Sequence, residues 1–216
     1  MASNPHLSSP LIEWDAEPAD MTTAVLAVHG RGQSPDFMRE QSRRLDIDNV
    51  RYFAPAADGN SWYPRPFLEP LDANQPSLDH ALDTIDARVD ALVDSGVDTA
   101  RLVVWGFSQG ACLLAHWALT RPRPVGGIIL FTGGYIGPED VVAQPESLNG
   151  VPVVVRSIEH DPFVPPERVT QTVAVLRAAG ADVDALIVPG DEHIITDEAI
   201  DAARKLLRRE ETMSLT

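Results

Sequence analysis

A serine flanked by glycines is the residue of this chain best placed for nucleophilic chemistry. The pentapeptide Gly106-Phe107-Ser108-Gln109-Gly110 follows an apolar run at residues 101–105 and precedes a helical apolar pattern at residues 109–119. In such a strand–turn–helix setting, glycines let the strand and the helix pack closely. The serine hydroxyl is then exposed at the helix N-terminus, which favours a developing oxyanion. We therefore predict Ser108 as a nucleophile; the alternative is a glycine-bounded turn with an incidental serine.

A serine hydroxyl needs a base to accept its proton, and the base needs an acid to orient it. In sheets that carry a serine turn of this kind, the order of the three residues along the chain is serine, acid, histidine. Asp161 and His193 have that order, each follows a late apolar run, and we predict them as the acid and the base. Glu159 is a competing acid. His116, within a helical pattern, and His160, just before the predicted acid, are interpreted as structural or solvated.

The turn His29-Gly30-Arg31-Gly32-Gln33 follows the first buried apolar run. Its glycines allow a backbone N–H to approach a substrate carbonyl, and we assign that donor to Arg31, with Gln109 as the second donor. His29 precedes the serine, which is the wrong order for the base, so we expect a structural role for it. For the Arg31 side chain two roles stay open: a solvated cation, or a ligand for an acidic group at the mouth of the pocket.

Short apolar runs alternate with helical patterns along the chain, which predicts a mostly parallel sheet with helices on both faces. One α/β domain is expected over residues 1–216, with residues 1–20 as an N-terminal extension or an edge strand. The expected strands are residues 24–28, 50–54, 101–105, 127–131, 151–155 and 183–188, and the expected helices are residues 78–93, 109–119, 166–179 and 197–208.

The composition excludes several classes of protein. The 216 residues include 17 basic and 32 acidic ones, giving a net charge of −15, which should repel nucleic acid and anionic membranes. Aspartate supplies 20 of the acids and Lys205 is the single lysine. Adaptation to high salt and the codon bias of a GC-rich genome are alternative explanations of this skew, and neither indicates a function.

Other features of the composition indicate an intracellular protein. One cysteine, Cys112, excludes a disulfide framework and a multi-cysteine metal cluster, and suits a reducing compartment. No apolar run approaches the roughly 20 residues that span a bilayer. Residues 1–10 lack the pattern of a signal peptide. We expect a cytoplasmic protein that does not insert into membranes.

Four motifs, in this order, resemble the phospholipase/carboxylesterase family of α/β-hydrolases: HGRG, GFSQGA, DPFVP beginning at Asp161, and GDEH ending at His193. The resemblance covers about residues 24–207. It implies an α/β-hydrolase fold without a large cap domain, and the same roles for Ser108, Asp161 and His193, with N–H donors at residues 31 and 109. One position departs from the family, because Ile158 stands where relatives usually have a glycine.

These residues together predict a serine carboxylesterase that hydrolyses short- to medium-chain acyl esters through an acyl-serine intermediate. The segment Asn60-Ser61-Trp62-Tyr63-Pro64 resembles a loop that borders the acyl pocket in relatives. We therefore expect Trp62, Tyr63 and Phe163 to line the pocket, whereas Phe67 suits the core equally well. Cys112 is expected to serve packing alone.

Two further hypotheses remain from the sequence. The same triad supports an acyl thioesterase or a lysophospholipase, and a non-catalytic binding protein could retain the scaffold. No cofactor or metal is expected. The expected partner is a small-molecule ester, and the expected state is a monomer or a homodimer.

Overall fold

One seven-stranded sheet forms the centre of the computed structural model, which describes residues 3–17 and 19–213, with side chains up to residue 208. The strand order is β1-β3-β2-β4-β5-β6-β7, and only β1, which pairs with β3, is antiparallel to its neighbour. The predicted mostly parallel α/β sheet is confirmed. Residues 1–2, 18 and 214–216 of the predicted domain lie outside the described residues.

The strands are β1 (Leu11–Asp15), β2 (Thr23–Val28), β3 (Val50–Pro55), β4 (Leu102–Phe107), β5 (Gly127–Phe131), β6 (Pro152–Ile158) and β7 (Asp182–Val188). The α-helices are α1 (Pro5–Ser8), α2 (Pro35–Arg43), α3 (Ser77–Asp94), α4 (Gln109–Thr120), α5 (Pro166–Ala178) and α6 (Asp197–Met213).

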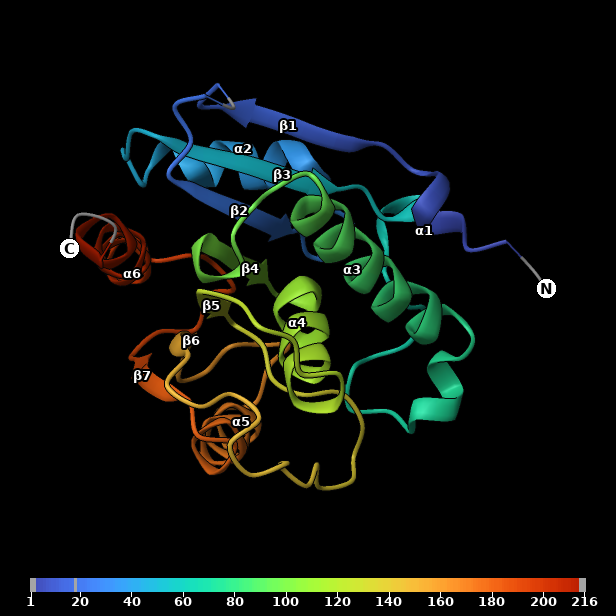
Figure 1. Cartoon of the computed structure of the whole chain (residues 1–216). Coiled ribbons are helices and arrows are strands. Elements are labelled where there is room, and N and C mark those ends of the chain that lie inside the picture. The colour runs from blue at the N-terminus through green and yellow to red at the C-terminus, as the bar shows by residue number, and fades with distance from the viewer. Residues whose placement is uncertain (1–2, 18, 214–216) are drawn as a thin grey trace.

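The central strands are apolar on both sides because each face of the sheet has its own helical layer. Along β2, Ala24, Leu26 and Val28 belong to one core cluster, and Val25 and Ala27 belong to the other. Residues of α3, α4 and α5 complete the first cluster, and residues of α2 and α6 complete the second (Figure 1). This two-layer cover explains why the strands read as continuous apolar runs.

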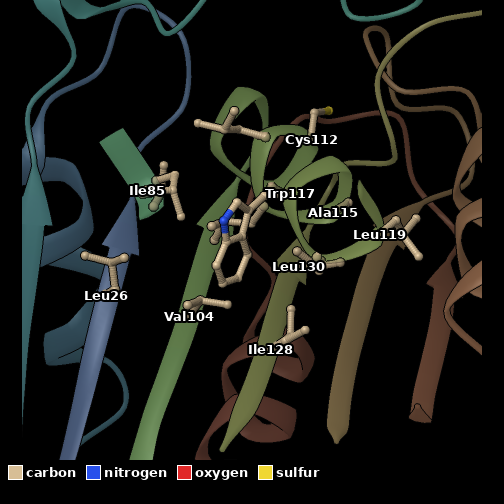
Figure 2. Packing of buried hydrophobic residues seen from close by; sticks show 14 of the residues in the cluster. Leu26, Ile85, Val104, Cys112, Ala115, Trp117, Leu119, Ile128 and Leu130 are labelled. Atoms are coloured by element: carbon tan, nitrogen blue, oxygen red, sulfur yellow. The ribbon is translucent and has the colours of Figure 1, made fainter. Parts of the chain in front are cut away.

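The first face has a dense core beneath α3 and α4. Figure 2 shows Leu26, Val104 and Ile128 rising from three strands toward Ile85 of α3 and Trp117 of α4. All five side chains are fully buried. The core therefore fixes α4, whose N-terminus follows Ser108, rigidly against the sheet.

Most predicted elements lie within a few residues of their expected bounds, and the short helix α1 was not predicted. Residues Leu11–Asp15 form the edge strand that was one of two options for residues 1–20. Helix α2 was not predicted, although Ser34-Pro35-Asp36 has the composition of a helix start, with proline in the first turn. The apolar stripe of α2 is short, which explains why periodicity alone did not reveal it.

The N-terminus of α4 lies in close contact with the end of β2. A Cβ at Gly110 would lie 2.1 Å from the Val28 carbonyl oxygen and 2.7 Å from that of His29. Only glycine permits this approach, which brings the turn at Ser108 beside the loop after β2. Because the carboxyl ends of the parallel strands share one edge of the sheet, the loops after β6 and β7 also meet there.

Gly110→Ala is expected to lower the free energy of unfolding by about 3 kcal/mol, because the added methyl group overlaps backbone atoms that cannot move aside. Gly59→Ala is the control, since Gly59 has a φ of 59° but no atom within 4 Å of its Cβ position. Only backbone strain of about 1 kcal/mol is expected there. Denaturant titration measures both; equal losses would contradict the proposed tight contact.

Candidate active site

Ser108 occupies a strained turn between β4 and α4. Its φ of 54° and ψ of −120° fall outside the regions that residues with side chains usually adopt, at a cost of roughly 1–3 kcal/mol. Two hydrogen bonds hold this conformation: Ser108 N–H donates to the Phe131 carbonyl at 2.9 Å, and Cys112 N–H donates to the Ser108 carbonyl at 2.9 Å. The turn presents the hydroxyl at the edge of the sheet where the loops converge.

The structure brings Ser108, His193 and Asp161 together in one hydrogen-bonded chain. His193 Nε2 lies 2.7 Å from Ser108 Oγ, and His193 Nδ1 lies 2.6 Å from Asp161 Oδ2. Because the carboxylate accepts the Nδ1 proton, Nε2 is left as the acceptor for the serine hydroxyl. This is the tautomer that a base for Ser108 requires.

Asp161 is held as an ionised acceptor in a buried position. Its Oδ1 accepts hydrogen bonds from the backbone N–H groups of Phe163 at 2.8 Å and Val164 at 2.9 Å. Burial raises the pKa of Asp161, but hydrogen bonds from His193 and these two N–H groups outweigh it, and the net pKa lies below the usual 3.8. The carboxylate is therefore charged at neutral pH.

The imidazole of His193 lies between two aromatic rings. Phe107 is 5.1 Å from it, centroid to centroid, and Phe163 is 5.0 Å away in an edge-on arrangement. These contacts restrict the tilt of the ring, a role for Phe107 that the sequence did not reveal. The competing acid Glu159 and the competing base His160 are both exposed and make no side-chain hydrogen bond among the described residues.

The residue that departs from the family pattern fits the loop without strain. Ile158 ends β6 with its side chain buried, and its carbonyl accepts from Asp161 N–H at 3.3 Å. The loop after the neighbouring strand packs against this residue: Gly190 has a φ of 148°, and its Cβ position is 3.0 Å from Ile158 Cγ2. Ile158 is therefore compatible with the position of Asp161 beside His193.

The backbone N–H groups of Arg31 and Gln109 make no hydrogen bond in the described part of the chain. Both residues line the same cavity as Ser108. Gly30 permits the close approach, because its Cβ position is 3.0 Å from Ser108 Cβ. Two unpaired donors, one from the loop after β2 and one from the start of α4, therefore lie in the cavity with Ser108, an arrangement that suits an oxyanion site.

His29 holds the loop that carries Arg31. Its Nδ1–H donates to the Gly30 carbonyl at 2.8 Å, and its Nε2 accepts from Ala57 N–H at 3.1 Å. Burial lowers the pKa of His29, so the neutral ring that these two bonds need is favoured. The structure thus gives His29 the structural role expected from its place in the sequence.

Residues 61–65 form a loop, here called the wall loop. The side chains of Arg31 and Gln109 form hydrogen bonds with its backbone. Gln109 Oε1 accepts from Trp62 N–H at 3.0 Å, and Gln109 Nε2 donates to the Tyr63 carbonyl at 2.8 Å. The Arg31 guanidinium donates to the Pro64 carbonyl at 2.8 Å and to the carbonyl of residue 65 at 2.7 Å. The sequence left the Arg31 side chain as a solvated cation or a ligand for an acidic group and gave the Gln109 side chain no role, so these bonds to the wall loop were not predicted.

A mostly apolar cavity of about 470 Å³ opens beside Ser108. The residues that line it are Arg31, Tyr63, Pro66, Phe67, Ser108, Gln109, Cys112, Phe163, Val164 and His193. Phe163 has 68% of its surface exposed and lies at the rim, whereas Tyr63 and Phe67 are buried walls. The volume is within the range of pockets for small ligands.

Two pocket predictions need correction. Trp62 does not line the cavity, because its indole is fully buried and its Nε1–H donates to the His29 carbonyl at 2.9 Å. It supports the wall from behind. Cys112, expected to serve packing alone, contributes to the lining, and burial raises the pKa of its thiol to about 12. Residues 61–65 form no strand, so no local pattern in the sequence distinguishes Trp62 from Tyr63.

The match to a family model for phospholipase/carboxylesterase proteins extends over residues 11–210. The chain belongs to this family. An acyl-protein thioesterase 1 of Gibberella zeae is 26% identical over 88% of this chain and 91% of its own length. A probable carboxylesterase of Arabidopsis thaliana is 25% identical over 87% and 78%. The crystal structure of a phospholipase/carboxylesterase from Dyadobacter fermentans has a TM-score of 0.86 and 32% identity, over 93% of this chain and 96% of that one.

Membership of the phospholipase/carboxylesterase family establishes the fold as that of an α/β-hydrolase and the protein as a serine hydrolase. Residues 3–17 and 19–213 include no large cap domain. Its relatives support esterase or thioesterase activity. Among the described residues, no helix is long and apolar enough to cross a membrane. No group of three or more histidine, cysteine or acidic side chains in the same part of the chain is arranged to hold a metal ion.

The lowered pKa of Asp161 predicts a specific dependence of stability on pH. Because the pKa is lower in the folded state, the carboxylate stabilises the fold above about pH 3.8, and this contribution is lost as the pH falls through the folded-state pKa. Denaturant titrations at several pH values should show the stability difference between wild type and Asp161→Asn shrinking below that pH. Glu159→Gln, at an exposed carboxylate, is the control and should change stability little. A difference that is independent of pH would contradict the prediction.

Proposed function

We propose that this member of the family is a carboxylesterase that hydrolyses short- to medium-chain acyl esters, with Ser108 as nucleophile, His193 as base and Asp161 as orienting acid. The observation that carries the proposal is the unbroken chain of hydrogen bonds from Ser108 Oγ to Asp161, with distances of 2.7 and 2.6 Å. The Ser108 end of this series of hydrogen bonds lies in the wall of an apolar cavity. Hydrolysis of an ester needs this combination of nucleophile, base and acyl site.

In the acylation step, Ser108 Oγ attacks the ester carbonyl carbon while its proton moves to His193 Nε2. The negative charge of Asp161 stabilises the imidazolium that forms. The N–H groups of Arg31 and Gln109 bind the oxyanion. When the tetrahedral intermediate collapses, His193 donates the proton to the departing alcohol oxygen and leaves an acyl-serine.

In the deacylation step, water attacks the acyl carbon and gives a proton to His193 Nε2. The second tetrahedral intermediate uses the same two N–H donors. Its collapse releases the carboxylic acid, and Ser108 Oγ recovers its proton from the imidazolium. The cavity walls formed by Tyr63 and Phe67 would surround the acyl chain during both steps, and its volume of about 470 Å³ suits a chain of short to medium length.

Thioester hydrolysis is the second candidate activity, supported by the name of the Gibberella zeae relative, acyl-protein thioesterase 1. The same residues handle oxygen and sulfur leaving groups. Matched pairs of an ester and a thioester with the same acyl chain would separate the two activities through their kcat/KM values. A lysophospholipase activity would appear as release of fatty acid from lysophosphatidylcholine.

The proposed function includes a substrate class, an oligomeric state and a cellular compartment. We propose a small-molecule ester as substrate, and a protein that acts as a monomer or homodimer without binding nucleic acid. The single cysteine, Cys112, is buried and unpaired. It supports a location in a reducing compartment, which we propose to be the cytoplasm.

Ser108→Ala is expected to lower kcat for p-nitrophenyl esters by about 10⁴-fold, because the covalent route is lost while the N–H donors remain. Esters from about two to about twelve acyl carbons should give an activity maximum at short or medium length in the wild type. Labelling with a fluorophosphonate should occur in the wild type and not in the variant. An enzyme that labels but cleaves no ester of the series would refute the substrate class; absence of both would refute the triad.

A further inference from the structure

The wall of the cavity differs in charge from the molecule as a whole. The chain has 32 acidic and 17 basic residues, yet the described lining contains no aspartate or glutamate and one arginine, Arg31. Asp161 lies behind His193 with its side chain fully buried, and its charge is engaged by that histidine. In a chain so rich in acids, a wall without acids and with one cation is suited to an anionic ligand.

The Arg31 guanidinium is oriented without being neutralised. It donates to the carbonyls of Pro64 and residue 65 at 2.8 and 2.7 Å, and it lies 5.8 Å from the centroid of the Tyr63 ring. Carbonyl oxygens are neutral, so these bonds fix the side chain and leave its full charge. Of the five N–H donors of a guanidinium, only two are used in this way.

Some of the described arginines have carboxylate partners, and others, such as Arg168, bind backbone carbonyls instead. Arg44 pairs with Asp197 at 2.7 Å, and Arg121 pairs with Asp83 at 2.7 Å. In contrast, no described carboxylate forms an ion pair with Arg31. Arg31 is exposed, but a guanidinium held by two carbonyl groups binds a carboxylate with less loss of side-chain freedom than one without such bonds.

We propose that Arg31 makes this enzyme selective for esters that carry a carboxylate, on either the acyl or the alcohol part, within reach of the cavity mouth. The proposal rests on the esterase function proposed above. The carboxylate pairs with the free N–H groups of the guanidinium while the ester carbonyl lies against Ser108. Arg31 thus has two separate roles, since its backbone N–H binds the oxyanion and its side chain selects the substrate.

Two pairs of substrates test the proposal, each pair differing only in charge at the remote group. The first pair is the mono-4-nitrophenyl ester of adipic acid and the 4-nitrophenyl ester of monomethyl adipate, with the charge on the acyl part. The second pair is 3-carboxyphenyl butyrate and its methyl ester, with the charge on the alcohol part. The measured quantity is the ratio of kcat/KM for the anionic ester to that for the neutral ester.

In at least one pair, the ratio for the wild type is expected to exceed that for Arg31→Met by about tenfold, which reflects one charge-assisted hydrogen-bonded pair. Arg31→Lys should keep part of the preference, because it keeps the charge but not the planar fork. Raising the salt concentration should narrow the difference between the wild-type ratio and that of Arg31→Met, because salt screens the contact with Arg31 while the remaining acids act alike on both proteins. The ratio cancels any effect of Arg31→Met on the wall loop that acts equally on both esters.

Arg65→Met is the matched control, because Arg65 is an exposed cation of the same loop whose side chain does not line the cavity. It should leave the ratio within about twofold of the wild type. Equal ratios for the wild type and Arg31→Met in both pairs would overturn the proposal while neutral esters are still cleaved. Loss of activity toward all the esters in the wild type, without fluorophosphonate labelling, would instead refute the esterase function itself.

Discussion

The close contact between the N-terminus of α4 and the end of β2 sets the geometry on which the site depends. A Cβ at Gly110 would lie 2.1 Å from the Val28 carbonyl oxygen, so only glycine lets the helix approach so near. The turn at Ser108 is thereby brought against Gly30, whose Cβ position is 3.0 Å from Ser108 Cβ. Nucleophile and first N–H donor come from different loops, and glycines on both sides remove the side chains that would separate them. The strain at Ser108 persists because the packed core beneath α4 leaves the turn no alternative.

In the proposed reaction, the wall loop links binding of the acyl chain to stabilisation of the oxyanion. Arg31 and Gln109 place their backbone N–H groups beside Ser108, and their side chains bind the wall loop at four backbone groups. Trp62 adds a bond from its indole N–H to the His29 carbonyl. A shift of the wall would therefore move the N–H donors as well. Rigid support of this kind keeps donors aimed where charge develops, which is the main requirement of electrostatic catalysis.

The sequence predicts what depends on local pattern and chain order. Buried strands read as apolar runs, and the order of Ser108, Asp161 and His193 along the chain allowed a specific assignment of roles. The sequence did not reveal the orientation of side chains in irregular loops. Trp62 and Tyr63 are neighbours of similar type, yet one supports the wall and the other forms it. Hydrogen-bond partners decide that difference, and no periodicity encodes them.

The charge of the whole molecule and the charge at its cavity lead to opposite expectations for an anionic ester. A net charge of −15 repels anions at a distance, but at physiological ionic strength this repulsion is screened over about 8 Å. Acids beyond that range act weakly on a ligand already in the cavity, whereas Arg31 acts at contact distance. The repulsion therefore slows encounter, and the contact favours the bound state. The net charge of the chain predicts that its surface repels anions. Whether the cavity binds an anionic ester depends instead on the position of individual charges, above all that of Arg31.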